Sequence, residues 1–264
     1  MKSCLDPELF GGKTYKLSMK CKILVATTNP GKIAEIRAML DPCLRRGFSP
    51  GHWPGYPRRQ AGANIPAKAG IELVGLSEFA GIGEVQEDGE TFAENARKKA
   101  LGYAKTIGLW TIADDSGLVV DALGGNPGVK SSRFSGEMAW PSLLGRQSNR
   151  KLLDHKNMAK VLKLLRNVPK EKRTARFVCC LCLASPEKVL IETQAELEGL
   201  IVDKEIGQNG FGYDPIFFVP GLNKTVGQLT AEEKNAISHR SQAIRKLKPL
   251  LENILRSSGL IQDA

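Results

Sequence analysis

The chain has 264 residues, 42% of them hydrophobic and 25% charged, and its net charge is +10. This composition is typical of a globular protein that buries a core without disulfides, and no apolar run approaches the 18 residues of a membrane-spanning helix. The positive charge favours anionic partners, which include nucleotides, nucleic acid and membrane surfaces. Because the charge is dispersed and only 6% of the residues are aromatic, a stacking surface for single-stranded nucleic acid is not expected.

The six cysteines form no CxxC pair and only three histidines accompany them, so a zinc site is not expected. Cys179, Cys180 and Cys182 lie in an apolar run that is typical of a buried strand. Residues 1–20 lack both the apolar block of a signal peptide and the acid-poor, Arg-rich character of a transit peptide. Together with free thiols, which suit a reducing compartment, this predicts a cytoplasmic protein with no membrane partner.

The first predicted elements are a strand, a turn and a helix. Residues 1–20 have the composition of a loose extension, and residues 22–26 (KILVA) predict a short buried strand. Asn29 is placed to cap a helix whose first residue is Pro30. Apolar residues at helical spacing continue that helix to residue 40.

Residues 41–68 are rich in proline, glycine and arginine and predict an irregular insertion. A strand over residues 71–74 follows. The sequence TFAE at residues 91–94 predicts a capping box that opens a helix, and Gly108 is placed to end it. We therefore expect one domain over residues 21–258, interrupted by the insertion.

Further strands and helices alternate through the rest of the chain. In chain order we expect strands over 109–113 and 118–122 around a turn, a loop over 124–150, a helix over 156–165, strands over 176–184 and 189–196, a glycine-rich loop over 207–212, a strand over 216–219 and, after a capping box at 230–233, a helical C-terminal segment. Adjacent strands combined with alternating β-α units predict an α/β fold, a mixed sheet with flanking helices.

The turn over residues 27–32 is the first candidate site. A strand that leads into a helix through small residues leaves backbone N–H groups facing outward. With the helix dipole these groups form an anion site, to which Lys32 adds a full charge. The spacing of a Walker A loop is absent, and most strand-to-helix turns bind no ligand, so the turn by itself leaves both interpretations open.

The acidic run Asp114-Asp115-Ser116-Gly117 is the second candidate. Carboxylates at a strand end, followed by glycine, can hold Mg²⁺ beside a phosphate. The same residue types are also the usual residues of a turn without a ligand. Because side chains alternate along a strand, we expect only one of the two aspartates to face a cleft.

Two more candidates lie in the C-terminal third. In residues 210–215 (GFGYDP), Phe211 or Tyr213 could stack on a base. The alternative, aromatic side chains buried in the core beneath a hairpin loop, applies above all to Phe211. Residues 234–240 (KNAISHR) place Lys, His and Arg near a helix start, where Arg suits phosphate or base edges. A single histidine is usually structural, and His239 is open to both interpretations.

Together these segments resemble the inosine triphosphate pyrophosphatase (Ham1) family of non-canonical purine nucleoside triphosphate pyrophosphatases. The matching stretches follow the family's order and cover most of residues 20–250: KILVATTNPGK (22–32), EDGETFAENA (87–96), ADDSGLVVDALGGNPG (113–128), SSRFSG (131–136), ARF (175–177), GFGYDPIFFVP (210–220), KT (224–225) and EEKNAISHR (232–240). The ordered set is far more specific than any one of its motifs.

The resemblance implies an elongated mixed sheet with helices in two lobes around a nucleotide cleft, Mg²⁺ as cofactor, and a homodimer. It implies that Asp115 is the catalytic base and that Asp115 and Glu87 hold the metal. It also implies a set of substrate-binding residues: Thr27, Thr28, Asn29, Lys32, Ser116, Phe211, Gly212, Tyr213, Asp214, Lys234, His239 and Arg240. The implied activity is hydrolysis of ITP, dITP, XTP or dXTP to the monophosphate and pyrophosphate, which removes aberrant purine nucleotides.

The chain departs from the family pattern in three places. Thr28 stands where glycine is usual, a change that bears on the phosphate turn, and residues 41–68 and 137–153 are longer than the pattern. Two other functions stay open. One is a related pyrophosphatase that acts on modified pyrimidine or methylated nucleotides. The other is a basic nucleic-acid-binding protein, which steeply salt-dependent binding would reveal, although no specific nucleic-acid partner is expected.

Overall fold

The computed structural model describes residues 21–45, 71–79, 81–136 and 146–258. The predicted extension over 1–20, the insertion beyond residue 45 and the segment 137–145 lie outside the described residues. Within the described part, seven strands form one sheet in the order β2-β1-β3-β4-β5-β6-β7. Their bounds are β1 Cys21–Ala26, β2 Ile71–Gly75, β3 Trp110–Val120, β4 Thr174–Ala184, β5 Val189–Ile201, β6 Phe217–Val219 and β7 Lys224–Thr225.

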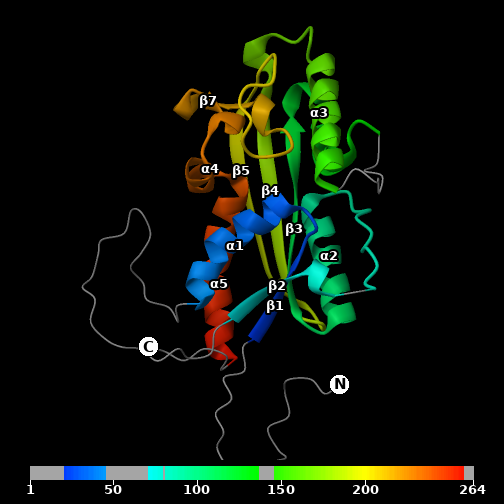
Figure 1. Ribbon diagram of the computed structural model, residues 1–264, viewed down its shortest axis with the longest axis vertical. Coiled ribbons are helices and arrows are strands. Elements are labelled where there is room, and N and C mark those ends of the chain that lie inside the picture. The colour runs from blue at the N-terminus through cyan, green and yellow to red at the C-terminus, as the bar shows by residue number, and fades with distance from the viewer. Residues whose placement is uncertain (1–20, 46–70, 80, 137–145, 259–264) are drawn as a thin grey trace, which may run out of the picture.

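The sheet is mixed, as predicted. β1 runs parallel to both β2 and β3, whereas β3 to β7 pair antiparallel with one another in sequence. The long strands β3, β4 and β5 extend from the lower to the upper part of the molecule and make the sheet elongated (Figure 1).

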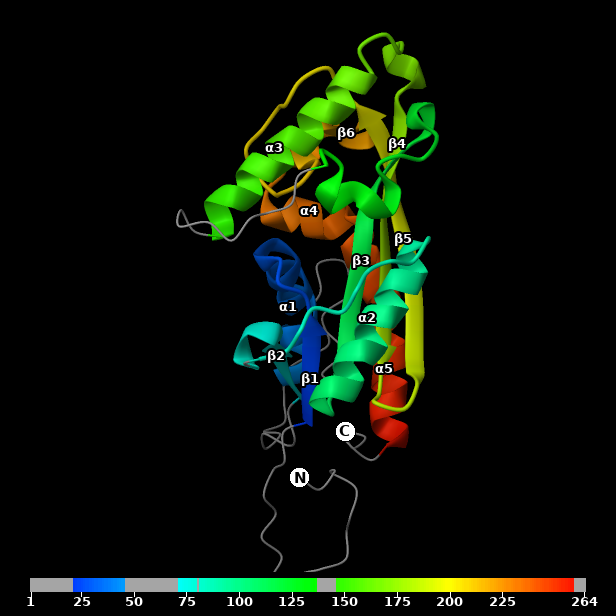
Figure 2. The same cartoon turned by 90° about the vertical axis from the view of Figure 1, so that its right-hand side faces the viewer.

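Five helices flank the sheet: α1 Pro30–Arg45, α2 Phe92–Ile107, α3 Arg146–Leu164, α4 Ala231–Ile237 and α5 His239–Ser257. α1 and α5 share one core cluster with one face of the sheet, and α2 forms a second cluster with the opposite face. α3 packs with β6 and the upper ends of the long strands in a third cluster. In Figure 2, α1 lies below and α3 above on one side of the long strands, with α4 between them. None of the helices in the described part of the chain combines the length and the hydropathy needed to cross a membrane.

Local signals place the start of α1 and both ends of α2. The Asn29 side chain accepts hydrogen bonds from the N–H groups of Gly31 (2.9 Å) and Lys32 (3.4 Å), and Pro30 is the first residue of α1. Thr91 and Glu94 form the predicted capping box of α2, and Gly108 ends that helix in the left-handed conformation. These predictions are confirmed because caps and αL glycines depend on residues within one turn of the helix end.

The predicted end of the first helix is wrong by five residues. α1 continues to Arg45, so residues 41–45 are helical and do not belong to the predicted irregular insertion. Most of the glycine and proline of residues 41–68 lies beyond Arg45, so the average composition of the segment does not reveal its helical beginning.

The prediction of two strands around a turn at residues 114–117 is also wrong. These residues lie in the middle of the single strand β3, with Asp115 opposite Cys180 of β4 and Gly117 opposite Val178. The preference of Asp, Ser and Gly for turns does not decide the structure here, because β4 pairs with this whole stretch and supplies partners for its backbone N–H and C=O groups. Gly117 serves close packing: a Cβ at this position would lie 2.8 Å from the carbonyl oxygen of Gly128.

The helix predicted to start near residue 156 starts ten residues earlier, at Arg146. The polar first half of α3 carries little apolar periodicity, and only tertiary contacts reveal its packed side, with Leu153 6% exposed. The predicted loop over 124–150 also contains a 3-10 segment, Gly128–Arg133. At the C-terminus the predicted helical segment is two helices, because Ser238 ends α4 and caps α5 by accepting from the N–H of Ser241.

Candidate active site

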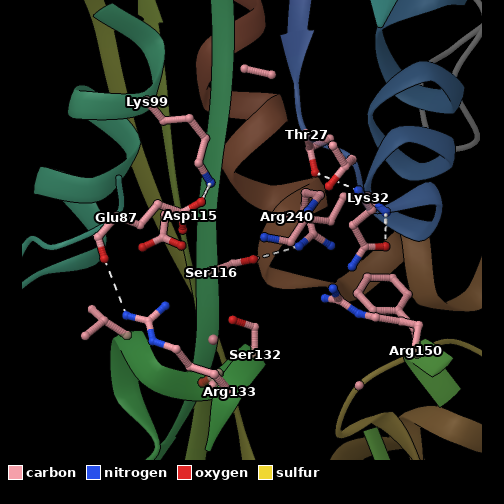
Figure 3. Close-up of a pocket in the computed structure, with 18 of the residues that line it drawn as sticks. Thr27, Lys32, Glu87, Lys99, Asp115, Ser116, Ser132, Arg133, Arg150 and Arg240 are labelled. Atoms are coloured by element: carbon pink, nitrogen blue, oxygen red, sulfur yellow. Dashed lines mark hydrogen bonds and ion pairs between the residues drawn. The ribbon is translucent and has the colours of Figure 1, made fainter. Parts of the chain in front are cut away.

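A cavity of about 430 Å³ lies where β1, α1, β3, α3 and the loop before β6 meet (Figure 3). Every site residue implied by the family resemblance lines it: Thr27, Thr28, Asn29, Lys32, Glu87, Asp115, Ser116, Phe211, Gly212, Tyr213, Asp214, Lys234, His239 and Arg240. Segments more than 200 residues apart in the sequence therefore converge on one space.

The turn between β1 and α1 forms one wall of the cavity. Thr27 Oγ1 accepts a hydrogen bond from the N–H of Asn29 (3.2 Å), which fixes the turn, and the Lys32 ammonium forms an ion pair with Asp114. Thr28 is exposed. Asn223 is the non-glycine residue of the described chain that has a positive φ, so Thr28 occupies ordinary backbone and no glycine is required there.

The two neighbouring aspartates of β3 have opposite surroundings. Asp115 lines the cavity and is 6% exposed, and its Oδ2 has no hydrogen-bond partner among the described residues. Burial raises the pKa of the Asp115 carboxyl to about 6, against the nearby charges of Lys32 and Lys99. The expectation that only one aspartate faces the cleft is confirmed.

Asp114 points to the other side of β3, where it is 1% exposed. Burial alone would raise its pKa, but Arg240 and Lys32 hold the pKa of this carboxyl well below its ordinary value. Arg240 Nε donates to Asp114 Oδ2 at 2.8 Å. Asp114 is therefore ionised and structural, since its charge is matched by the buried Arg240 and the partly buried Lys32.

Buried ion pairs continue from Asp114 to the base of the glycine-rich loop. Glu35 of α1 pairs with both Arg240 and Lys234, and Lys234 Nζ lies 2.6 Å from Asp214 Oδ2. Asp214 also accepts from the N–H of Phe211 at 2.9 Å. We name the six residues of this chain of ion pairs the buried ionic cluster: Lys32, Glu35, Asp114, Asp214, Lys234 and Arg240. It joins α1, β3, the loop and the α4–α5 junction behind the cavity.

Among the aromatic residues of the loop, Phe211 and not Tyr213 is accessible. Tyr213 is 5% exposed and its hydroxyl donates to the carbonyl of Ser131 at 2.7 Å, and burial raises its pKa. Phe211 is half-buried in the cavity wall, with its ring against Gly31 and Lys234 Nζ 4.3 Å from the ring centroid. The expectation that core burial applies above all to Phe211 is therefore wrong. One face of its ring packs on Gly31 of α1, and the ring is not enclosed in the hydrophobic core.

His239 is 6% exposed and stacks on Phe177, with ring centroids 4.9 Å apart. Burial, followed by the charges of Arg240 and Lys234, holds the pKa of His239 well below its ordinary value. The imidazole is therefore neutral, and its Nδ1 has no hydrogen-bond partner among the described residues. It can bind a ligand by hydrogen bonding but contributes no charge.

Comparison with known proteins identifies the family. The model of the Ham1 family matches residues 23–250. The chain belongs to the Ham1 family. It is 40% identical over 233 residues to the dITP/XTP pyrophosphatase of Desulforamulus reducens, an alignment that covers 88% of this chain and 96% of that protein. It is 39% identical over 229 residues to the dITP/XTP pyrophosphatase of Bacillus subtilis, covering 87% and 96%.

Solved structures agree with the fold of this Ham1 family member. The structure of a HAM1 protein from Coxiella burnetii matches it with a TM-score of 0.67 at 33% identity and covers 88% of this chain and 99% of that chain. The predicted α/β class, with a mixed sheet and flanking helices, is confirmed.

The Ham1 site contains functional candidates that sequence reasoning missed. Lys99 of α2 is buried, with Nζ 2.7 Å from Glu87 Oε1 and 3.2 Å from the carbonyl oxygen of Asp114. Glu35 lies on α1 three residues after Lys32. Lys99 follows the predicted apolar position Ala96 by three residues, and Glu35 follows Lys32 by the same spacing. Residues at this spacing lie on one face of a helix, so the spacing could have placed both side chains on the face that meets the sheet. Polar lining residues that were also missed include Ser132, Arg133, Arg150 and Asp154.

Asp115 and Glu87 are suited to hold a metal ion. No group of three or more His, Cys, Asp and Glu side chains arranged to hold a metal occurs among the described residues. Mg²⁺, however, takes one or two carboxylates and keeps several waters. The orphan Oδ2 of Asp115 and the half-buried Glu87 supply such oxygen donors, so the residues present fit a hydrated magnesium ion.

Proposed function

We propose that this chain hydrolyses the non-canonical purine nucleoside triphosphates ITP, dITP, XTP and dXTP to the nucleoside monophosphate and pyrophosphate. The observation that carries the proposal is the Asp115 carboxylate. It is buried in the cavity with an unpartnered oxygen and a pKa of about 6, between the turn over residues 27–32 and Glu87. A base with that pKa is ionised at neutral pH and can still accept a proton.

In this mechanism Asp115 orients a water molecule and takes its proton as the water oxygen attacks the α-phosphorus. The new P–O bond forms in line with the bond to the β-phosphate, which breaks to release pyrophosphate. Lys32 and the N-terminal end of α1 lie beside the departing phosphates and stabilise their charge. Pyrophosphatases of this kind are generally metal-dependent. Mg²⁺ held by Asp115 and Glu87 would neutralise phosphate charge and lower the pKa of a bound water.

Selectivity for 6-oxo purines follows from hydrogen-bond donors at the aromatic end of the cavity. A pocket that donates to a 6-oxo group leaves its donors unpaired against the amino group of adenine, which is a donor itself.

A homodimer and a cytoplasmic location, both expected from the sequence, belong to this proposal. Sedimentation analysis of the purified chain tests the homodimer.

The decisive test is pyrophosphate release from dITP, XTP, dATP and dGTP, with Mg²⁺ and with EDTA in its place. We expect dITP and XTP to be hydrolysed far faster than dATP and dGTP, and EDTA to remove the activity. Preference for a modified pyrimidine or methylated nucleotide in the same assay would replace the proposed substrate class. Equal rates with EDTA would contradict the metal.

A further inference from the structure

Six cationic side chains line the cavity: Lys32, Lys99, Arg133, Arg150, Lys234 and Arg240. Four of these six cations are paired with carboxylates. Lys99 lies 2.7 Å from Glu87, Lys234 lies 2.6 Å from Asp214, and Arg240 lies 2.8 Å from Asp114, which also pairs with Lys32. Within the described part of the chain, Arg133 and Arg150 are the lining cations without a carboxylate at such a distance. Their N–H donors are therefore available to a ligand.

Arg150 and Arg133 line different parts of the cavity. Arg133 donates weakly to the carbonyl oxygen of Glu87, at 3.4 Å. In the view of Figure 3, Glu87 and the guanidinium of Arg133 lie to the left of β3 and Arg150 lies to its right. Arg133 is therefore the cation beside Glu87, and Arg150 lies away from Glu87.

The backbone of α3 fixes the place of Arg150. Asp154, one helical turn after Arg150, accepts a hydrogen bond from the N–H of Gly212 at 2.9 Å, which fastens α3 to the loop that carries Phe211. The Nε of Arg150 is 3.9 Å from Asp154 Oδ1, too far for a hydrogen bond, and its side chain is 40% exposed. Arg150 therefore lies on the helix that is tied to the loop carrying Phe211, and its guanidinium makes no hydrogen bond to Asp154.

We propose that Arg150 is a specificity residue that donates two hydrogen bonds to O6 and N7 of a 6-oxo purine base. The inference rests on the proposed function, which places the phosphates at the turn over residues 27–32 and at Asp115. The base then lies towards the loop of Phe211 and Gly212, which Asp154 ties to the helix of Arg150 in the lining of the same cavity. A planar guanidinium matches the two acceptors O6 and N7 of a 6-oxo purine.

This geometry discriminates between classes of purine in a defined way. Hypoxanthine, xanthine and guanine all present O6 and N7, so Arg150 favours all three over adenine, whose N6 amino group is a donor. Arg150 therefore separates 6-oxo from 6-amino purines, and discrimination against guanine arises elsewhere in the cavity.

The test compares kcat/KM of the wild type and Arg150→Ala for dITP, dGTP, dATP and 7-deaza-dGTP, in which a C–H group replaces N7. We expect Arg150→Ala to lower kcat/KM for dITP and dGTP about tenfold or more, the size of one bidentate base contact. The value for dATP should change by about twofold or less, and that for 7-deaza-dGTP should fall less than that for dGTP. Lys151→Ala is the matched control, because Lys151 is exposed on the same helix and does not line the cavity.

An equal loss for all four nucleotides would overturn the proposal in favour of a phosphate contact or a structural role. Unchanged kinetics with every nucleotide would overturn it as well. A wild type that hydrolyses none of the four contradicts the proposed function and Arg150 with it. An active wild type whose preference for dITP over dATP survives Arg150→Ala contradicts the role of Arg150 alone.

Discussion

The two sides of β3 carry the same residue type in opposite environments. On one side Asp114 belongs to the buried ionic cluster, paired with Lys32 and Arg240, and its pKa is held well below the ordinary value. On the other side Asp115 has an unpartnered oxygen and a pKa raised to about 6 by burial. One peptide bond separates a carboxylate that is fully matched from one that is not.

The difference shows how a site can be both rigid and reactive. The buried ionic cluster ties α1, β3, the glycine-rich loop and α5 together behind the cavity. A buried cluster of this kind is costly to break because each lost partner leaves an uncompensated charge. Asp115 lacks such partners, and its Oδ2 is available for the metal ion, water or substrate that the proposed function requires. The paired side holds the geometry, and the unpaired side is available for chemistry.

The largest effect is expected at Asp115. Asp115→Asn keeps the size of the side chain but removes its charge, so the proposed base and metal roles are lost together, and we expect kcat to fall about 10²–10⁴-fold or more. Pyrophosphate release from dITP measures it. Asp203→Asn is the control, since Asp203 is an exposed aspartate paired with Arg173, and its activity should be unchanged. Near-normal turnover by folded Asp115→Asn would remove Asp115 from the mechanism.

The next effect is on stability and concerns Asp114. Asp114→Asn leaves the buried Arg240 and Lys32 short of a counter-charge, and we expect the free energy of unfolding to fall by about 3–5 kcal/mol. Urea unfolding measures it. Asp121→Asn, which breaks an exposed pair with Arg176, should cost about 1 kcal/mol or less. Similar losses in both variants would show that the cluster does not hold the site.

The third effect is a pH dependence of metal-free protein. The pKa of Asp115 rises from its ordinary 3.8 to about 6 on folding, so the folded state binds the proton more tightly. The stability from this protonated carboxyl is fully present below pH 3.8 and is lost as pH rises through about 6, on the order of 3 kcal/mol in total.

Urea unfolding in EDTA of the wild type and Asp115→Asn between pH 4 and 8 isolates this contribution. The stability of the wild type relative to the variant should decline over that interval and level off above pH 6. A constant difference would mean that Asp115 does not titrate in this range.

The smallest effect is expected at Thr28, in the turn that carries Lys32 to Asp114. Thr28 is exposed and its φ is not positive, so Thr28→Gly relieves no strain and only adds backbone freedom. We expect a change in stability of about 0.5 kcal/mol or less and a KM for dITP within about twofold of the wild type. A KM several-fold lower in the variant would show that the threonine distorts the phosphate turn.

The predictable parts of the fold are those with local causes. Asn29 and Pro30 predict the start of α1, the Thr91 capping box predicts the start of α2, and Gly108 predicts its end. These signals are readable from the sequence because each acts within one helical turn. The alternation of side chains along a strand likewise predicted that Asp114 and Asp115 face opposite ways. Every site residue that the ordered motifs implied lines the same cavity.

The sequence by itself determined most of the order of strands and helices, the caps of α1 and α2, and which residue types are available for the proposed contacts with phosphate, metal and base. Only the tertiary structure decided that residues 114–117 stay extended, since the partner β4 lies about sixty residues away. Only the tertiary structure pairs Glu35 with Arg240 and Lys99 with Glu87, and only it shows that the N–H donors of Arg150 make no hydrogen bond to Asp154. The physical reason is that a charge acquires its role from what surrounds it. Whether a carboxylate is matched or reactive depends on burial and on counter-charges from distant segments, which no local pattern records.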